Sequence, residues 1–187
     1  WPSITSLENG VIVAACSGFR LGHLCPFGKT TLFYSFDNGT TWSPPVVVND
    51  TPLDDRDAGL LSLGGKRLLL SWFNLDIKYY RVNFSKHMQE NMPKNEYNMS
   101  MEIINRYTDE MNRKEVGSFV RLSKDGGITW GKASRVPVTA PHGPCLLSDG
   151  SLLFLGKGFE LKEADDVIMA WRSYDEGATW SPAGTIP

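Results

Sequence analysis

Short apolar or alternating runs of four to six residues recur along the chain, separated by turn-forming residues. The clearest runs are 10–15, 31–34, 45–48, 58–61, 118–122, 143–147 and 167–171. Runs of this length, bounded by Gly, Asn, Asp, Ser and Pro, are typical of β-strands rather than helices. The pattern therefore predicts a chain built mainly from short strands joined by tight turns.

One eight-residue motif occurs three times, each time directly after a predicted strand. It reads Ser-x-Asp-x-Gly-x-Thr-Trp and occupies residues 35–42, 123–130 and 173–180. The Asp carboxylate can accept backbone N–H bonds and the Gly tolerates positive φ, as a hairpin turn requires. The Asp residues of the motif are therefore interpreted as turn residues without a chemical role. Internal repetition of this kind indicates a repeat protein.

The spacing of the motif indicates a repeat of about fifty residues with one interruption. The intervals are 123 − 35 = 88 and 173 − 123 = 50 residues, and removing the 34 residues 83–116 reduces the first to 54. That segment reads as helix, because Ile103, Ile104 and Tyr107 lie at helical spacing, and Pro93 is expected to split it. A helical insertion at about 83–116 thus interrupts the second repeat.

Each repeat then contains four short strands with the motif between the third and fourth, which is typical of a propeller blade. We expect an all-β fold with one partial propeller domain over 1–187. Its three blades lie at about 1–50, 51–139 including the insertion, and 140–187. Closed propellers have about 4 to 8 blades, so the open strand edges need a cover. Either the remaining blades of a longer parent chain or a second copy of this chain would supply it.

The three motifs, the opening Pro2-Ser3-Ile4 and the segments 56–61 and 140–144 resemble the sialidase-like (neuraminidase) family with bacterial neuraminidase, or Asp-box, repeats. The resemblance covers nearly the whole chain apart from the helical insertion. It implies a six-bladed ring, of which this chain supplies half, and a secreted or periplasmic protein. No signal-peptide pattern occurs in residues 1–187, which leaves the compartment open. Asp boxes also occur in non-sialidase propellers, so the resemblance speaks for fold more than for activity.

Composition narrows the class of partner. Hydrophobic residues make up 41% and charged residues 21% of the chain, and the net charge is −2. No apolar run reaches the length of a membrane span, and no basic patch suggests a nucleic-acid partner. Cys16, Cys25 and Cys145 lack metal-ligand spacing and are interpreted as buried thiols, with a disulfide or ligand role as the alternative. The sequence therefore indicates no metal site and no cofactor.

Blade topology predicts which loops share a face. The Asp boxes and the first hairpin turn of each blade emerge at one end, so the other connections must emerge at the opposite end. That opposite face collects 17–23, 49–57, the insertion and 139–142. Arg20 and Arg56 lie on it and suit an acidic sugar, because a guanidinium can hold a carboxylate through two parallel hydrogen bonds.

The family resemblance implies further roles. Sialidases hold the substrate carboxylate with three arginines, and use an Asp as general acid and a Tyr assisted by a Glu as nucleophile. Arg20 resembles the second of these arginines, whereas the third and the Tyr/Glu pair would belong to the missing blades. The chain departs from the family pattern because residues 17–30 contain no carboxylate. Asp54, Asp55 or Asp57 in the next loop could replace the acid. Asp57 and Asp55 are the candidates for a site role, and otherwise they are loop caps or partners of Arg56.

Two histidines are further candidates for ligand contact. His142 stands at the start of an innermost strand and is placed to point into a central channel, with a buried, hydrogen-bonded side chain as the alternative. His23 lies on the same face in a loop with glycine at residue 22.

The leading hypothesis from the sequence is a sialidase-like glycoside hydrolase that acts on terminal sugars of glycans, acidic ones included, and is incomplete in this chain. By itself the chain is expected to be inactive. The alternative is a non-catalytic Asp-box propeller module that binds glycan or protein, with the helical insertion and its Met residues as the contact surface.

Overall fold

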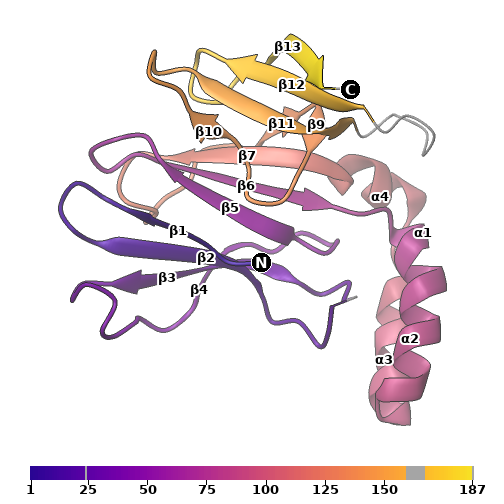
Figure 1. The fold of residues 1–187 in the computed structure, drawn as a ribbon. Helices are drawn as coiled ribbons and strands as arrows, with labels where there is room; N and C mark the ends of the chain where they lie inside the picture. Colours follow the sequence, from indigo (N-terminus) through magenta and orange to yellow (C-terminus); the bar gives the residue numbers. More distant parts are fainter. Residues whose placement is uncertain (24, 159–166, 187) are drawn as a thin grey trace.

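The computed structural model describes residues 1–23, 25–158 and 167–186, and consists of three antiparallel sheets packed face to face with one helical segment (Figure 1). Sheet 1 contains β1 (Ser3–Ser6), β2 (Ile12–Gly18), β3 (Lys29–Ser35) and β4 (Val46–Asn49). Sheet 2 contains β5 (Arg56–Ser62), β6 (Leu68–Asn74), β7 (Gly117–Ser123) and β8 (Ser134–Val136). Sheet 3 contains β10 (Cys145–Leu146), β11 (Leu152–Gly158), β12 (Ile168–Ser173) and β13 (Ser181–Ile186), with β9 (Val138–Thr139) paired to the far end of β11. The predicted antiparallel, strand-rich fold is confirmed.

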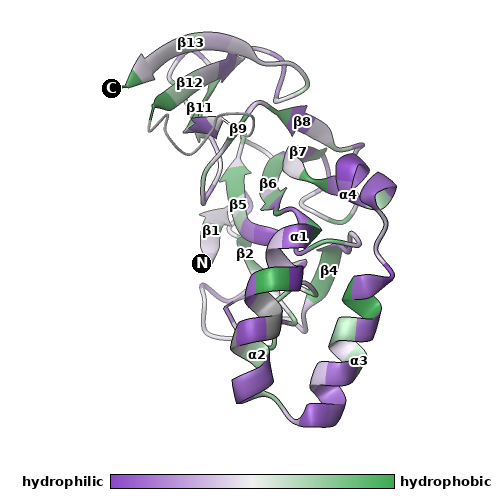
Figure 2. Ribbon diagram, turned by 90° about the vertical axis from the view of Figure 1, so that its right-hand side faces the viewer, coloured by the Kyte–Doolittle hydropathy of each residue, from purple (hydrophilic) through white to green (hydrophobic). Residues whose placement is uncertain are grey.

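The middle sheet explains why some strands alternate in hydrophobicity and others do not. In β2 the buried residues Val13 and Ala15 face sheet 2, so burial alternates along the strand. In β6 every residue from Leu68 to Trp72 is buried, because sheets 1 and 3 cover both faces of sheet 2. The first interface has Leu68, Leu70 and Trp72 in its core, and the second has Leu69. Figure 2 shows the resulting hydrophobic strands β5 and β6.

The helical segment begins at Ile77 rather than at residue 83. It comprises α1 (Ile77–Tyr79), the π-helix η1 (Tyr80–Phe84), α2 (Ser85–Asn91), α3 (Lys94–Asn105) and α4 (Asp109–Glu115). The earlier start has a local cause, because the Asp76 side chain caps the backbone N–H of Lys78 at 2.8 Å and Ile77 is fully buried. Pro93 is the N-cap of α3, so the predicted break in the insertion is confirmed.

The insertion packs against the connection between sheets 1 and 2. Leu53 in that connection forms a separate small core with Ile77, Tyr80, Met88 and Ile104 of the insertion. Helices α2 and α3 project beyond the sheets, and their projecting ends are mostly hydrophilic (Figures 1 and 2). The helical insertion in sheet 2 therefore packs on the connection that leaves sheet 1 and holds it in place.

The sheets have two distinct ends. At one end Ser35 of the first Asp box pairs with Ile12, next to the β1–β2 turn; at the other, Gly18 pairs with Lys29. We call the first the box end and the second the front end. In Figure 1 the hairpin turns of the box end lie on the left and the helical insertion lies at the front end, on the right. The predicted separation of the Asp boxes from the candidate site residues is therefore observed.

The three Asp boxes share one hydrogen-bond arrangement. In the first, the Asp37 carboxylate accepts bonds from the Ser35 hydroxyl at 2.9 Å, the Thr41 backbone N–H at 2.8 Å and the Thr41 hydroxyl at 2.6 Å. The bonds from Thr41 lower the pKa of Asp37 to about 2. Equivalent bonds hold the carboxylates of Asp125 and Asp175. Each carboxylate accepts its hydrogen bonds from residues of its own turn, as the sequence predicts.

The boxes of sheets 2 and 3 also join neighbouring sheets. The Tyr34 hydroxyl of sheet 1 donates to the Gly127 carbonyl of the second box at 3.1 Å. Arg67 of sheet 2 pairs with Glu176 of the third box at 2.5 Å. Each of these boxes thus rests on the sheet that precedes it.

Candidate functional site

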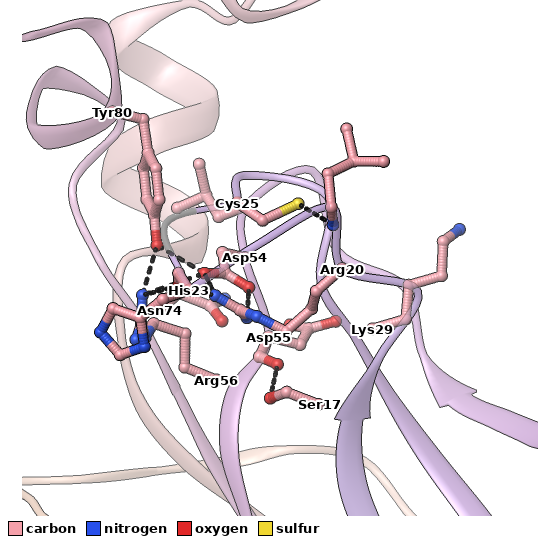
Figure 3. Close-up of polar contacts among 12 residues, drawn as sticks. Ser17, Arg20, His23, Cys25, Lys29, Asp54, Asp55, Arg56, Asn74 and Tyr80 are labelled. Atoms are coloured by element: carbon pink, nitrogen blue, oxygen red, sulfur yellow. Dashed lines mark hydrogen bonds and ion pairs between the residues drawn. The ribbon is translucent and has the colours of Figure 1, made fainter. Parts of the chain in front are cut away.

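The candidate arginines meet around Asp54, one of the carboxylates that the sequence suggests as a replacement acid. Asp54, in the connection between sheets 1 and 2, lies between Arg20, which follows β2, and Arg56, which begins β5 (Figure 3). Arg20 donates to both Asp54 oxygens, once from Nη1 and once from Nη2 at 3.0 Å. The Arg56 Nη1 to Asp54 Oδ2 distance is 3.4 Å. Both predicted anion ligands are therefore already paired within the protein.

The helical insertion contributes the fourth member of this cluster. The Tyr80 hydroxyl in η1 donates to Asp54 Oδ2 at 2.6 Å and accepts from Arg56 Nη1 at 3.5 Å. The backbone carbonyl of His23 accepts from Arg20 Nη2 at 2.6 Å. We call Arg20, Asp54, Arg56 and Tyr80 the arginine–aspartate cluster. It joins two sheets, their connection and the insertion at one point.

Burial and charge act against each other within the cluster. Burial raises the pKa of the Asp54 carboxyl group above its ordinary value, and Arg20, the Tyr80 hydroxyl and Arg56 reduce this rise. The two facing guanidinium groups favour the ionised form of Asp54, because a protonated Asp54 would leave Arg20 without a counter-charge. Burial lowers the pKa of Arg56, but the bond to Tyr80 and the charges of Asp54 and Asp57 leave it raised. Burial, with the charge of Asp54, also raises the pKa of Tyr80 far above its ordinary value, so Tyr80 is a neutral donor.

Asp55 points away from the cluster into the protein. Its side chain is fully buried, and its two oxygens accept from the Thr51 hydroxyl at 2.8 Å and the Thr51 backbone N–H at 3.1 Å. Burial raises the pKa of Asp55 to about 7. The Ser17 hydroxyl donates to the Asp55 backbone carbonyl at 2.6 Å, which ties the connection to β2. In this arrangement the Asp55 carboxyl group has no path to a ligand.

Asp57 has a different environment. It lies in β5, the first strand of sheet 2, with a left-handed backbone at φ 49°. Within the described residues no hydrogen bond reaches its carboxylate, and its charge acts on the neighbouring Arg56. Of the two candidate acids, Asp57 is therefore the one whose carboxylate is not occupied by the protein.

The two candidate histidines lie apart. His23 contributes its backbone carbonyl to the arginine–aspartate cluster. His142 is exposed, with a left-handed backbone at φ 70°, and its main chain lies against Gly59 of β5. A Cβ at Gly59 would lie 2.3 Å from the His142 carbonyl atoms, so this close approach of sheets 2 and 3 requires glycine. The main chain at His142 thus lies beside β5, the strand that carries Asp57.

Backbone strain has a clear distribution in the described residues. Five non-glycine residues have positive φ, and two of them, Asn38 and Glu176, occupy Asp-box turns. The other three are Phe19, Asp57 and His142. Each of these three is a candidate residue or the chain neighbour of one, since Phe19 directly precedes Arg20. Left-handed non-glycine residues cost energy and cluster at functional sites.

Unpaired buried polar atoms lie outside the Asp boxes. In the described part of the chain they are Arg56 Nε, Ser71 Oγ, Trp72 Nε1, Asn74 Oδ1, Arg81 Nε and Thr139 Oγ1. None belongs to an Asp box. Buried polar groups without partners are rare in native proteins and need an explanation.

Two hollows in the surface lie away from these residues. One, of about 320 Å³, is an apolar hollow on the open face of sheet 1, lined by Ile4, Phe33 and Trp42 among others. The other, of about 920 Å³, lies between sheets 2 and 3 near α4 and includes Arg113 and Trp171. Among the described residues no group of His, Cys, Asp or Glu is placed to hold a metal ion. Within that same part, no helix has the length and apolar character needed to cross a membrane.

Sequence reasoning missed two residues of this site and the role of a third. The sequence suggests Asp54 as a replacement acid and does not reveal its pairing with Arg20, which lies 34 positions away in the chain. Tyr80 fell outside the predicted insertion, although Asp76 followed by Ile77 is a helix-start signal that could have found it. Gly28 leaves room for the pair, since a Cβ there would lie 2.1 Å from Asp54 Oδ1.

Comparison with known proteins supports the interpretation of the repeats. The BNR/Asp-box repeat family profile matches residues 33–44, which span the first box. A Hadza microbial sialidase superposes with a TM-score of 0.54 at 17% identity, over 98% of this chain and 37% of that one. The chain therefore contains a BNR/Asp-box repeat and shares its fold with sialidases of known structure.

Other solved structures are also similar to this chain. A Dyadobacter fermentans protein of unknown function has a TM-score of 0.64 at 20% identity, over 99% of this chain and 54% of that one. An α-L-arabinanase from Penicillium chrysogenum, in complex with arabinobiose, has a TM-score of 0.55 at 14% identity, covering 97% and 49%. No curated protein sequence gives a significant match. The chain therefore spans about half or less of these structures, and the likeness establishes the fold only.

Proposed function

We propose that residues 1–187 are one partial propeller domain of a glycoside hydrolase that acts on terminal sugars of glycans. Its three blades, at about 1–50, 51–139 and 140–187, form half of a six-bladed ring. The remaining blades of a parent chain or a second copy of this chain complete the ring and the site. By itself the chain is inactive, because the nucleophile belongs to the missing half.

One observation carries this proposal: outside the Asp boxes, the described non-glycine residues with left-handed backbone are Phe19, Asp57 and His142. All three accompany residues selected from sequence for their chemistry. Strain of this kind persists only where the surrounding structure enforces it, and it is concentrated in catalytic and binding sites. The unpaired Nε of Arg56 in the same region supports a polar ligand there.

The site residues take different roles in the proposal. Asp57 is the general acid, since the described residues leave its carboxylate without a hydrogen bond and it lies on the first strand of sheet 2. Arg20, Arg56, His23 and His142 surround the ligand. Asp55, which the sequence also suggested as an acid, supports the connection between sheets from behind the site.

The direct test measures turnover of fluorogenic glycosides, a sialoside and an arabinofuranoside, by the full-length protein. Asp57→Asn should lower kcat by about 10² to 10⁴, the range for loss of a general acid, without changing the melting temperature. Asp50→Asn is the matched control, because Asp50 lies in the same connection but is exposed and pairs with Lys29. Equal turnover of wild type and Asp57→Asn would remove the acid from the proposal.

A second candidate function is a non-catalytic propeller module that binds glycan or protein. The absence of a carboxylate from residues 17–30 favours it, as do the exposed apolar side chains of the insertion, Tyr79, Val82, Met99 and Ile103. Binding of a glycan without turnover of any glycoside, in a full-length protein that lacks a Tyr/Glu pair in its other blades, would establish this alternative.

A further inference from the structure

Asp54 fills the position that a ligand carboxylate would take between two arginines. Its side chain is surrounded by protein groups and has 0% of its surface exposed to solvent. Oδ1 accepts from Arg20, and Oδ2 accepts from Arg20 at 3.0 Å, Tyr80 at 2.6 Å and Arg56 at 3.4 Å (Figure 3). Both oxygens are therefore saturated, and the two-bond geometry with Arg20 is the one a guanidinium makes with an anionic ligand.

We infer that Asp54 is a resident counter-ion that occupies the carboxylate position, so that this half of the proposed site receives an uncharged sugar. The inference rests on the proposed function and specifies its substrate class. It separates this chain from a sialic-acid site, in which free arginines hold the acid group of the substrate.

The pairing of charges supports an uncharged ligand. The Asp54 carboxylate pairs with both Arg20 and Arg56, so neither guanidinium is left without a counter-charge. An entering carboxylate would have to lose its hydration without gaining a free guanidinium.

The surrounding residues enforce the pair. Gly28 provides the space, because a Cβ there would lie 2.1 Å from Asp54 Oδ1 and 2.5 Å from Arg20 Nη1. The Asp55 N–H donates to the Gly28 carbonyl at 3.0 Å, which holds the two loops together. Tyr80 covers the pair from the insertion with a buried hydroxyl. A ligand carboxylate cannot displace Asp54 without moving three segments of the chain.

One donor in the cluster remains unused. Arg56 is 6% exposed, and its Nε has no hydrogen-bond partner among the described residues. A single N–H suits the oxygen of a sugar hydroxyl, whereas a carboxylate prefers two parallel donors. The arginine that sequence reasoning assigned to an acid group is thus left with a contact suited to a hydroxyl.

The first experiment uses the full-length protein and formate, the smallest carboxylate. Asp54→Ala should bind formate in the vacated position, so its melting temperature should rise saturably with formate and not with chloride at equal ionic strength. Wild type and Asp50→Ala should not respond. An Asp54→Ala variant that folds and ignores formate would overturn the counter-ion assignment.

The second experiment compares binding of neutral monosaccharides, L-arabinose and D-galactose, with that of sialic acid, by saturation-transfer NMR. Wild type should bind a neutral sugar, whereas Asp54→Ala, which vacates the carboxylate position, should gain roughly tenfold or more in affinity for sialic acid. Tighter binding of sialic acid than of neutral sugars by wild type, or binding of neither, would overturn the inference. Neutral-sugar binding without any turnover would instead count against hydrolysis alone.

Discussion

The box end and the front end of the sheets are built on opposite principles. At the box end each Asp carboxylate is satisfied within eight residues, and Ser35, Ser123 and Ser173 repeat the same bonds. At the front end, groups from three distant segments form one buried cluster, and Arg56 keeps an unpaired Nε. Hydrogen bonds made within one motif stabilise the box end, whereas buried charge is tolerated where a protein binds or converts another molecule.

The largest expected contrast between the ends is the pH dependence of stability. Asp55 has a pKa of about 7 in the folded protein against 3.8 for the free group, so its contribution is fully present below pH 4. That contribution is lost as pH rises toward and through 7, because folding then requires a buried charge. The loss amounts to up to about 4 kcal/mol, at 1.36 kcal/mol for each pKa unit. Asp37 and Asp125, whose pKa is lowered to about 2, have the opposite pH dependence. Their contribution to stability is present at neutral pH and is lost only in acid.

Urea unfolding followed by tryptophan fluorescence between pH 4 and 7.5 measures this directly. Asp55→Asn should flatten the decline between pH 5 and 7, while Asp37→Asn should leave it unchanged. The two ends would not differ as described if wild-type stability were level or rising over that range.

A smaller effect is expected from the hydroxyl that joins the insertion to the front end. Tyr80→Phe removes the bond to Asp54 and should cost about 1.5 to 3 kcal/mol, the range for a hydrogen bond to a charged group. Tyr79→Phe is the matched control, because Tyr79 is 41% exposed and should change stability by no more than about 0.5 kcal/mol. Equal unfolding free energies for the two variants would show that the insertion does not support the cluster.

The smallest effect tests the box end. Gly39 and Gly127 have nearly the same backbone, with φ 87° and 89°, so Ala costs both the same strain. A Cβ at Gly39 meets nothing within 4 Å, whereas at Gly127 it would lie 2.6 Å from the Tyr34 hydroxyl. Gly127→Ala should therefore be about 1 kcal/mol or more less stable than Gly39→Ala in thermal or urea unfolding. A reversed order would contradict packing of the second box on sheet 1.

What the sequence reveals depends on the distance over which each interaction acts. The Asp-box turns could be predicted because Ser35, Asp37 and Thr41 satisfy one another within a single motif, and the motif repeats. The arginine–aspartate cluster could not, because it joins Arg20 to Asp54 and Asp54 to Tyr80 across 34 and 26 positions. The candidate arginines were located on the correct face, but their partner was not identified. Only folded packing brings Gly28 against that pair.

The open face of sheet 1 gives the stack of sheets a direction. Leu32 and Tyr34 point toward the following sheet, while Phe33 and Trp42 line the hollow on the reverse side, where Trp42 is 42% exposed. The second and third boxes each contact the preceding sheet, so the open face of sheet 1 is suited to a further sheet packed in the same order. If two copies paired through their open faces symmetrically, Trp42 of one would face Trp42 of the other, and neither first box would contact a preceding sheet. A sheet that packs on this face therefore needs the same orientation as sheets 1 to 3.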